Sequence, residues 1–167
     1  MADPSRTQVR CRASTRQALA EACYPDDSAA ERAGTGLTIE CINPPDLPVP
    51  ETYSQVVVAT GTRMIFIAGQ EPEDGRGDLV GRGDFSVQAH QVFANLGRAL
   101  AAAGALPSQV ARITIYVVDY QRDYHVPIFE EARLALFGDH RPADVVLGVA
   151  TLSPGYLIEV DAIAVID

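Results

Sequence analysis

The stretch Arg141–Asp167, RPADVVLGVATLSPGYLIEVDAIAVID, decides how this chain folds. Two apolar runs rich in β-branched residues, 145–151 and 157–166, flank the segment Leu152-Ser153-Pro154-Gly155. β-Branched residues favour strands, whereas Pro and Gly favour tight connections. The stretch therefore predicts a strand, a turn and a second strand.

Carboxylates interrupt both of these apolar runs. Asp144 stands at the start of the first run, and Glu159 and Asp161 lie within the second. Because side chains alternate along a strand, Glu159 and Asp161 share one face. A carboxylate among apolar residues is costly unless it is paired, hydrogen-bonded or exposed to a cleft. Asp144 and Glu159 are therefore candidates for a functional site, whereas Asp161 is interpreted as structural.

The C-terminal stretch resembles the end of the RidA/YjgF family, small trimeric proteins that include enamine/imine deaminases. The matching segments are Pro142-Ala143, Leu152, Ile158–Val165, Tyr53-Ser54-Gln55 and Ala68-Gly69-Gln70, with Ala68 where Ser is usual. The spacing from the Pro-Ala pair to Glu159 needs no gap, and the resemblance extends over about residues 37–167. One departure matters most: the family's Arg after Pro-Ala is Asp144 in this chain.

Hydrophobic periodicity predicts an α+β fold with the order β-β-β-α-β-α-β-β. Before the C-terminal pair, strands are expected at 37–42, 52–59, 63–68 and 110–118, with a hairpin connection at 60–62. Helices are expected from Asp84 or Ser86 to Gly104, and from near Tyr124 to Gly138. The resemblance implies the same order in a chorismate-mutase-like arrangement, a mixed sheet with both helices on one face.

An apolar sheet face without helices must be buried by something else. In the family, three subunits bring their sheets together as a barrel, and ligand clefts lie between neighbours. A homotrimer is therefore expected for the domain at residues 37–167. Residues 1–36 carry five Arg and five acidic residues. They are expected to form an appended arm, disordered or containing a short helix, with a targeting segment as the less favoured alternative.

Composition narrows the classes of function. Every one of the 13 basic residues is Arg, which excludes a lysine Schiff base and a Walker-type phosphate loop. The net charge of −9 argues against nucleic-acid binding and leaves a ribonuclease as a distant third hypothesis. The 3 cysteines, an odd number, indicate reduced thiols in a cytoplasmic protein. No metal-ligand spacing and no membrane-length apolar run is present, so we expect neither cofactor nor membrane partner.

The resemblance assigns roles to individual positions. In deaminating relatives, the Arg after Pro-Ala clamps a substrate carboxylate, and backbone amides near Gly69 and Val146 would complete the anchor. Glu159 occupies the position that orients or activates the attacking water. Tyr53 occupies the position that closes the cleft from a neighbouring strand.

Asp144 changes what the site can bind. Two like charges about 4 Å apart cost roughly 4 kcal/mol at an effective dielectric constant near 20, so a free 2-imino acid should be rejected. Three possibilities remain: Asp144 recognises a neutral or cationic substrate, it forms an acid–base pair with Glu159, or the parent activity is lost. Arg141 could also swing in to replace the clamp, as a minority hypothesis.

Structural explanations compete with these functional ones. Glu159 could be hydrogen-bonded or salt-bridged at a trimer contact, Asp144 could cap a strand start at the surface, and Tyr53 could be an interface aromatic. The histidines His90, His125 and His140 are expected at the surface. The leading hypothesis is a small-molecule hydrolase or deaminase, in which Asp144 and Glu159 activate water to attack an enamine or imine without a free carboxylate. The alternative is a non-catalytic, ligand-binding or regulatory trimer.

Overall fold

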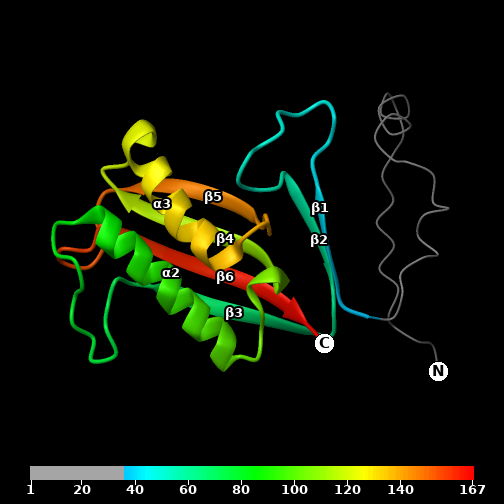
Figure 1. The fold of residues 1–167 in the computed structure, drawn as a ribbon, viewed down its shortest axis with the longest axis horizontal. Helices are drawn as coiled ribbons and strands as arrows, with labels where there is room; N and C mark the ends of the chain where they lie inside the picture. Colours follow the sequence, from blue (N-terminus) through cyan, green and yellow to red (C-terminus); the bar gives the residue numbers. More distant parts are fainter. Residues whose placement is uncertain (1–35) are drawn as a thin grey trace, which may run out of the picture. The chain divides into compact units, whose positions relative to one another are not determined.

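A computed structural model describes residues 36–167, so the predictions for the N-terminal arm lie outside the described residues, apart from Gly36. The elements, in chain order, are β1 (Thr38–Ile42), β2 (Val56–Thr60), β3 (Arg63–Gln70), α2 (Phe85–Ala102), a 3-10 turn (Pro107–Gln109), β4 (Val110–Val118), α3 (Arg122–Phe137), β5 (Ala143–Val149) and β6 (Ile158–Ile166). The predicted order of strands and helices is confirmed. Figure 1 shows α2 and α3 lying over the same face of a mixed sheet.

The strands pair differently from what the sequence suggests. The main sheet has the order β3-β6-β4-β5, with β4 parallel to β5 and antiparallel to β6. The two C-terminal strands therefore flank β4 instead of pairing with each other. β2 pairs with β1 in a separate two-stranded sheet, so the expected β2–β3 hairpin is wrong. Alternation specifies that a strand forms and which face it buries, but not which strand it pairs with.

The glycine between β2 and β3 serves a close approach instead of a hairpin. A Cβ on Gly61 would lie 2.6 Å from Cγ1 of Val165 and 2.8 Å from the carbonyl oxygen of Ile166. The next residue, Thr62, donates its backbone N–H to that same carbonyl at 3.0 Å. The segment therefore passes against the end of β6, where no side chain fits.

Helix α2 begins where the sequence indicates. The Asp84 side chain caps it by accepting from the backbone N–H of Val87 at 3.1 Å. A buried polar residue, Gln88, then links this helix to the turn before β6. Its amide donates to the carbonyls of Gly81 and Gly155, and its Oε1 accepts from the N–H of Leu157 at 2.8 Å.

Helix α3 begins at Arg122, two residues before the predicted start near Tyr124. The backbone N–H of Gln121 donates to Nδ1 of His125 at 2.9 Å, so this histidine satisfies the helix start. His125 is only 7% exposed, and its ring packs edge-on against Phe85. The surface prediction is therefore wrong for His125, whereas His90 is exposed as predicted.

The other face of the sheet carries apolar side chains with little cover. Phe66 is 72% exposed, Met64 61% and Leu147 42%. Within residues 36–167 both long helices lie on the opposite face, as the sequence predicts. None of the helices in this part of the chain has the length and hydropathy to cross a membrane. We call this the open face of the sheet.

Candidate functional site

The strand register separates the predicted site residues into two groups. On β4, Ile113 lies opposite Asp144 and Tyr116 lies opposite Glu159. Because Ile113 and Tyr116 are three positions apart on one strand, their side chains point to opposite faces. Asp144 therefore lies on the helix-covered face and Glu159 on the open face. Within one chain they do not form the acid–base pair considered above.

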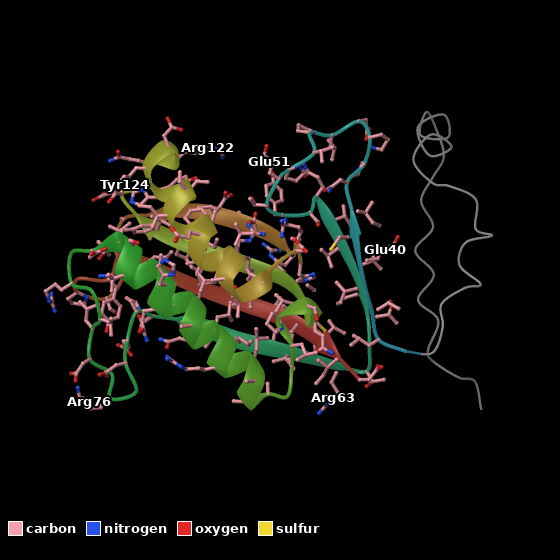
Figure 2. The ribbon with its side chains drawn as sticks, in the orientation of Figure 1. Glu40, Glu51, Arg63, Arg76, Arg122 and Tyr124 are labelled. Carbon is pink, nitrogen blue, oxygen red and sulfur yellow. The ribbon has the colours of Figure 1, made fainter. Side chains whose placement is uncertain are left out.

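A cavity of about 390 Å³ lies on the helix-covered side, between α3, β5 and the segment 52–55, and we call it the α3 cavity. It brings together three of the predicted residues, Tyr53, Asp144 and Val146. Helix α3 contributes two residues that the sequence did not single out, Glu130 and Arg133. Arg122, also from this helix, lines the cavity as well, and Figure 2 shows it at the N-terminal end of α3.

A buried salt bridge forms part of the cavity wall. Nη1 of Arg133 donates to Oδ2 of Asp144 at 2.7 Å, and the two side chains are 3% and 8% exposed. The expectation of an unpaired negative charge in the cleft is therefore wrong. Charge-assisted hydrogen bonds of this length are the strong kind, and the pair carries no net charge. The like-charge repulsion argued above for a bound carboxylate is thus largely cancelled.

Burial and pairing act in opposite directions on this salt bridge. Burial raises the pKa of the Asp144 carboxyl, while the nearby Arg133 guanidinium lowers it. Burial also lowers the pKa of Arg133, and the charge of Asp144 raises it. Guanidinium groups keep their proton in proteins, and the short contact favours the ionised carboxylate, so we treat the pair as charged.

One nitrogen of Arg133 has no hydrogen-bond acceptor among the described residues. Nη2 is buried, and the carboxylate of Asp144 is reached only by Nη1. A buried donor without an acceptor costs about 1–3 kcal/mol. An unsatisfied donor therefore lies within the packed wall of the α3 cavity, with almost no surface exposed to it.

Arg141 is occupied elsewhere. Its Nε donates to the carbonyl of Glu51 at 3.0 Å, and its Nη1 donates to the carbonyl of Gly138 at 2.7 Å. These bonds tie the segment before β2 to the end of α3. The geometry gives no support to Arg141 as a replacement clamp.

On the open face, Glu159 lies directly over Gly69. A Cβ on Gly69 would overlap Oε1 of Glu159 and lie 2.6 Å from its Cδ. Gly69 sits in an irregularity of β3, where the pairing with β6 shifts between Ile67 and Gln70. The neighbouring Asp161 accepts a hydrogen bond from the hydroxyl of Tyr116 at 2.9 Å, which indicates a structural role.

We expect Gly69→Ala to displace the Glu159 carboxylate. Because the overlapping atoms are at the end of a flexible side chain, the stability change should stay below about 1 kcal/mol, while misplacement of a reacting group costs roughly 100-fold in rate. Gly75→Ala is the matched control, since a Cβ there has open space. Denaturant unfolding and turnover of the two variants check this. Equal turnover in Gly69→Ala and Gly75→Ala would contradict the expected displacement of the Glu159 carboxylate.

The half-buried carboxyl of Glu159 has a raised pKa, chiefly because burial disfavours its charged form, with further contributions from Glu71 and Asp161. A raised carboxyl pKa means that the folded state holds its proton to higher pH than the unfolded state. Stability from this group is therefore present below the unfolded pKa and is lost as pH rises through the folded pKa.

Glu159→Gln should accordingly be more stable than the parent at pH 7. The difference in stability between Glu159→Gln and the parent should become smaller towards pH 4, where Glu159 is protonated in the folded state. Thermal unfolding of both proteins across this range measures the difference. A variant that is less stable at pH 7 would show that the ionised carboxylate has a stabilising partner.

Sequence reasoning missed Arg133 although a signal was present. Arg133 follows Phe129 by four residues, so it lies on the same buried face of α3. Among residues 36–167, no group of three or more His, Cys, Asp or Glu side chains is arranged to hold a metal ion. The expectation of no cofactor stays a prediction.

Comparison with known proteins agrees with the fold and the motifs. The family model described as Endoribonuclease L-PSP matches residues 46–166. A RutC family protein of Pyrococcus horikoshii is 36% identical over 112 residues, which cover 67% of this chain and 85% of that protein. Protein DfrA of Myxococcus xanthus is 36% identical over 113 residues, covering 68% and 84%.

Solved structures give the same result. A protein of unknown function of the conserved Rid family from Yersinia pestis superimposes with a TM-score of 0.71 at 33% identity, covering 77% of this chain and 98% of that one. RidA from an Antarctic Psychrobacter superimposes with a TM-score of 0.57 at 27% identity, covering 76% and 99%. With the motifs around Gly69 and Glu159, these matches show that the chain belongs to the RidA/YjgF family.

Proposed function

We propose that this protein hydrolyses an enamine or imine that lacks a free carboxylate, and that Glu159 activates the attacking water. The observation that carries the proposal is the position of Glu159. Its half-buried carboxylate lies over Gly69, at the position that handles water in deaminating relatives, and its pKa is raised. A carboxyl with a raised pKa takes up a proton more readily than an ordinary carboxylate, which suits a general base that later returns the proton.

The reaction needs few groups. The substrate reacts as the iminium, C=NH2⁺, which an imine forms by taking a proton on nitrogen and an enamine by taking one on carbon. Water adds through its oxygen to the carbon, and Glu159 takes the proton that water loses, which gives a neutral carbinolamine with an amine nitrogen. Glu159 then returns that proton to the nitrogen, the C–N bond breaks to release ammonia, and the proton of the hydroxyl group passes to the ammonia, which leaves a carbonyl and ammonium. No redox partner is required.

The charge balance of the α3 cavity supports a substrate without a free carboxylate. Arg133 and Asp144 neutralise each other, so the wall offers no net positive charge to an anion. An anion is therefore disfavoured because the wall offers it no net attraction, and not because Asp144 alone repels it. Asp144 then acts on the substrate through Arg133 and not as an acid or base.

We further propose a homotrimer in the cytoplasm, with each site shared between copies. Its two halves lie on opposite faces of one chain, so a site that uses both must form where two chains meet. The apolar open face provides a surface for that contact. Subunit association would bury Phe66 and Met64 and stabilise the assembly.

Phe66→Arg should lower the oligomeric state, because a charge would replace an apolar side chain within the contact. Sedimentation velocity measures the change. Leu134→Arg is the matched control, since Leu134 is 47% exposed on α3 and should tolerate the substitution. If both variants keep the parent's sedimentation coefficient, the open face is not the contact.

Ammonia release from an imine tests the activity. An imino amide formed in situ by oxidation of an amino amide with an added amine oxidase should lose ammonia faster with the protein than in buffer alone. Binding of the compound without acceleration would favour the alternative, a non-catalytic trimer that binds a ligand. The endoribonuclease description of the family model is not extended to this chain, because a net charge of −9 opposes contact with phosphates.

A further inference from the structure

We propose that Glu71 is a specificity-determining residue of the site around Glu159, and that it makes this site select a cationic C=N group over a neutral group of the same shape. The cationic group is an iminium in a substrate or an amidinium in a ligand that does not react. The choice of the iminium as reacting group rests on the proposed function, whereas binding of an unreactive cation requires no turnover.

The strand register brings Glu71 close to Glu159. Strand β3 ends at Gln70, which lies opposite Val160 of β6, a residue of the core. Because the pair is antiparallel, continuing this register by one residue places Glu71 opposite Glu159, on the open face. Residues opposite each other in such a pair have their Cβ atoms about 4.5–5.5 Å apart. Gly69 leaves the space that the Glu159 carboxylate occupies.

Hydrogen bonds hold Glu71 in this position. The hydroxyl of Ser153, in the connection before β6, donates to Oε1 of Glu71 at 3.0 Å. From α2, Nδ2 of Asn95 donates to the backbone carbonyl of Glu71 at 2.9 Å. The residue is only partly exposed. Its carboxylate therefore has a defined place beside Glu159, unlike a charge on a solvated loop.

The charges of Glu71 and Glu159 are not compensated by the described part of the chain. Like charges opposite each other on neighbouring strands are destabilising. Within residues 36–167, no Arg or His lies within salt-bridge distance of either carboxylate. Arg98 lines a cavity together with Glu71, but its guanidinium donates to Asn95. A bound cation would relieve this repulsion, whereas a neutral ligand would not.

This arrangement suits the form in which the substrate reacts. Water attacks the iminium, C=NH2⁺, and a nearby negative charge favours the protonated nitrogen over the neutral imine. Glu71 itself takes no proton and forms no bond, because Glu159 remains the base. Its role is to increase the share of bound substrate that is ready for attack.

Acetamidine and acetamide are a matched pair of probes for the full-length protein. At pH 7 acetamidine is a planar cation that contains C=NH2⁺, and acetamide is its neutral counterpart. Ligand-detected NMR titration should show the parent binding acetamidine at least ~10-fold more tightly than acetamide. Glu71→Gln, which keeps an acceptor for Ser153, should lose about 10-fold in acetamidine affinity while acetamide affinity stays within about threefold. Equal affinity for both probes in the parent, or unchanged acetamidine affinity in Glu71→Gln, would overturn the proposal.

Asp78→Asn is the matched control for net charge. Asp78 lies in the same loop as Glu71, and its side chain is 72% exposed. The variant should bind both probes like the parent. An equal loss of acetamidine affinity in Asp78→Asn and Glu71→Gln would mean that the net charge of −9 attracts the cation, and would reject Glu71 as the determinant.

A titration of the parent protein tests the same arrangement without a variant. Burial raises the pKa of Glu159, and the charges of Glu71 and Asp161 raise it further. The other ionisable group facing Glu159 is Tyr116 on β4, which donates to Asp161. Carbon-detected NMR of the Glu159 carboxyl should show its pKa falling when acetamidine binds, but not when acetamide binds. A pKa that acetamidine leaves unchanged would place the cation away from this site and overturn the proposal.

The two proposals fail in distinguishable ways. Selective acetamidine binding that depends on Glu71, together with no ammonia release from any imino amide, would reject the enzyme and keep the selectivity. Ammonia release that depends on Glu159, together with equal binding of the two probes, would reject the selectivity and keep the enzyme.

Discussion

Arg133→Met is expected to destabilise the protein by about 3–5 kcal/mol, a large share of the free energy of unfolding of a domain this size. The reason is the group left behind: Asp144, only 8% exposed, would lose its charged partner at 2.7 Å. An uncompensated buried carboxylate must either take up a proton or draw water into the cavity wall. Urea unfolding at pH 7 measures the loss.

Two controls test whether the destabilisation comes from the unpaired charge of Asp144 or only from the lost packing of the Arg133 side chain. Arg133→Met combined with Asp144→Leu should recover most of the stability, because replacing both members of a buried ion pair by apolar residues is often neutral. Arg76→Met removes an exposed partner of Asp74 and Asp78, so its unfolding midpoint should stay close to that of the parent. A double variant no more stable than Arg133→Met would mean that the charge of Asp144 is not the cause.

Much of the fold follows from local pattern. The bounds of β4, Val110–Val118, agree with the prediction. The strand is apolar over most of its length, so it can be recognised in the sequence although its apolar and polar residues do not alternate. The helix ends also agree, since Asp84 begins α2 and Gly138 ends α3. These signals act within a few residues of the feature that they specify.

The pairing of strands could not be obtained in this way. β5 and β6 are neighbours in sequence, yet β4 lies between them because β5 runs parallel to β4. Parallel pairing depends on the crossover through α3, which packs on the sheet as a unit. A turn signal such as Pro154-Gly155 indicates that the chain changes direction, but it does not show which strand the following strand pairs with.

The candidate site divides in a similar manner. Family motifs locate Asp144 and Glu159 along the chain, but only the register shows that they point to opposite faces. The partner of Asp144 lies 11 residues earlier on another element. An isolated Arg on a helix is usually exposed, so the four-residue spacing from Phe129 was a weak signal on its own, and the packing of α3 on β5 shows that this Arg is buried.

Glu159→Gln is expected to reduce turnover of an imino amide by about 10²- to 10⁴-fold, the range contributed by a positioned general base. Glutamine keeps the size and the hydrogen-bonding oxygen of the side chain but cannot take a proton from water. If catalysis is a proton transfer at Glu159, the fall should appear in kcat, with KM nearly unchanged. Ammonia release under saturating substrate measures it.

Asp161→Asn is the matched control, because Asp161 shares the open face with Glu159 but is hydrogen-bonded to Tyr116. Its turnover should stay within about fivefold of the parent. The stability of Glu159→Gln at pH 7 adds an independent criterion. If Glu159 is kept for catalysis at a cost to folding, replacing it should raise the stability of the protein and lower its turnover in the same variant. Glu159→Gln that is more stable at pH 7 and nearly inactive fits a catalytic base. A variant more stable at pH 7 with parental turnover would leave Glu159 without a role in the reaction.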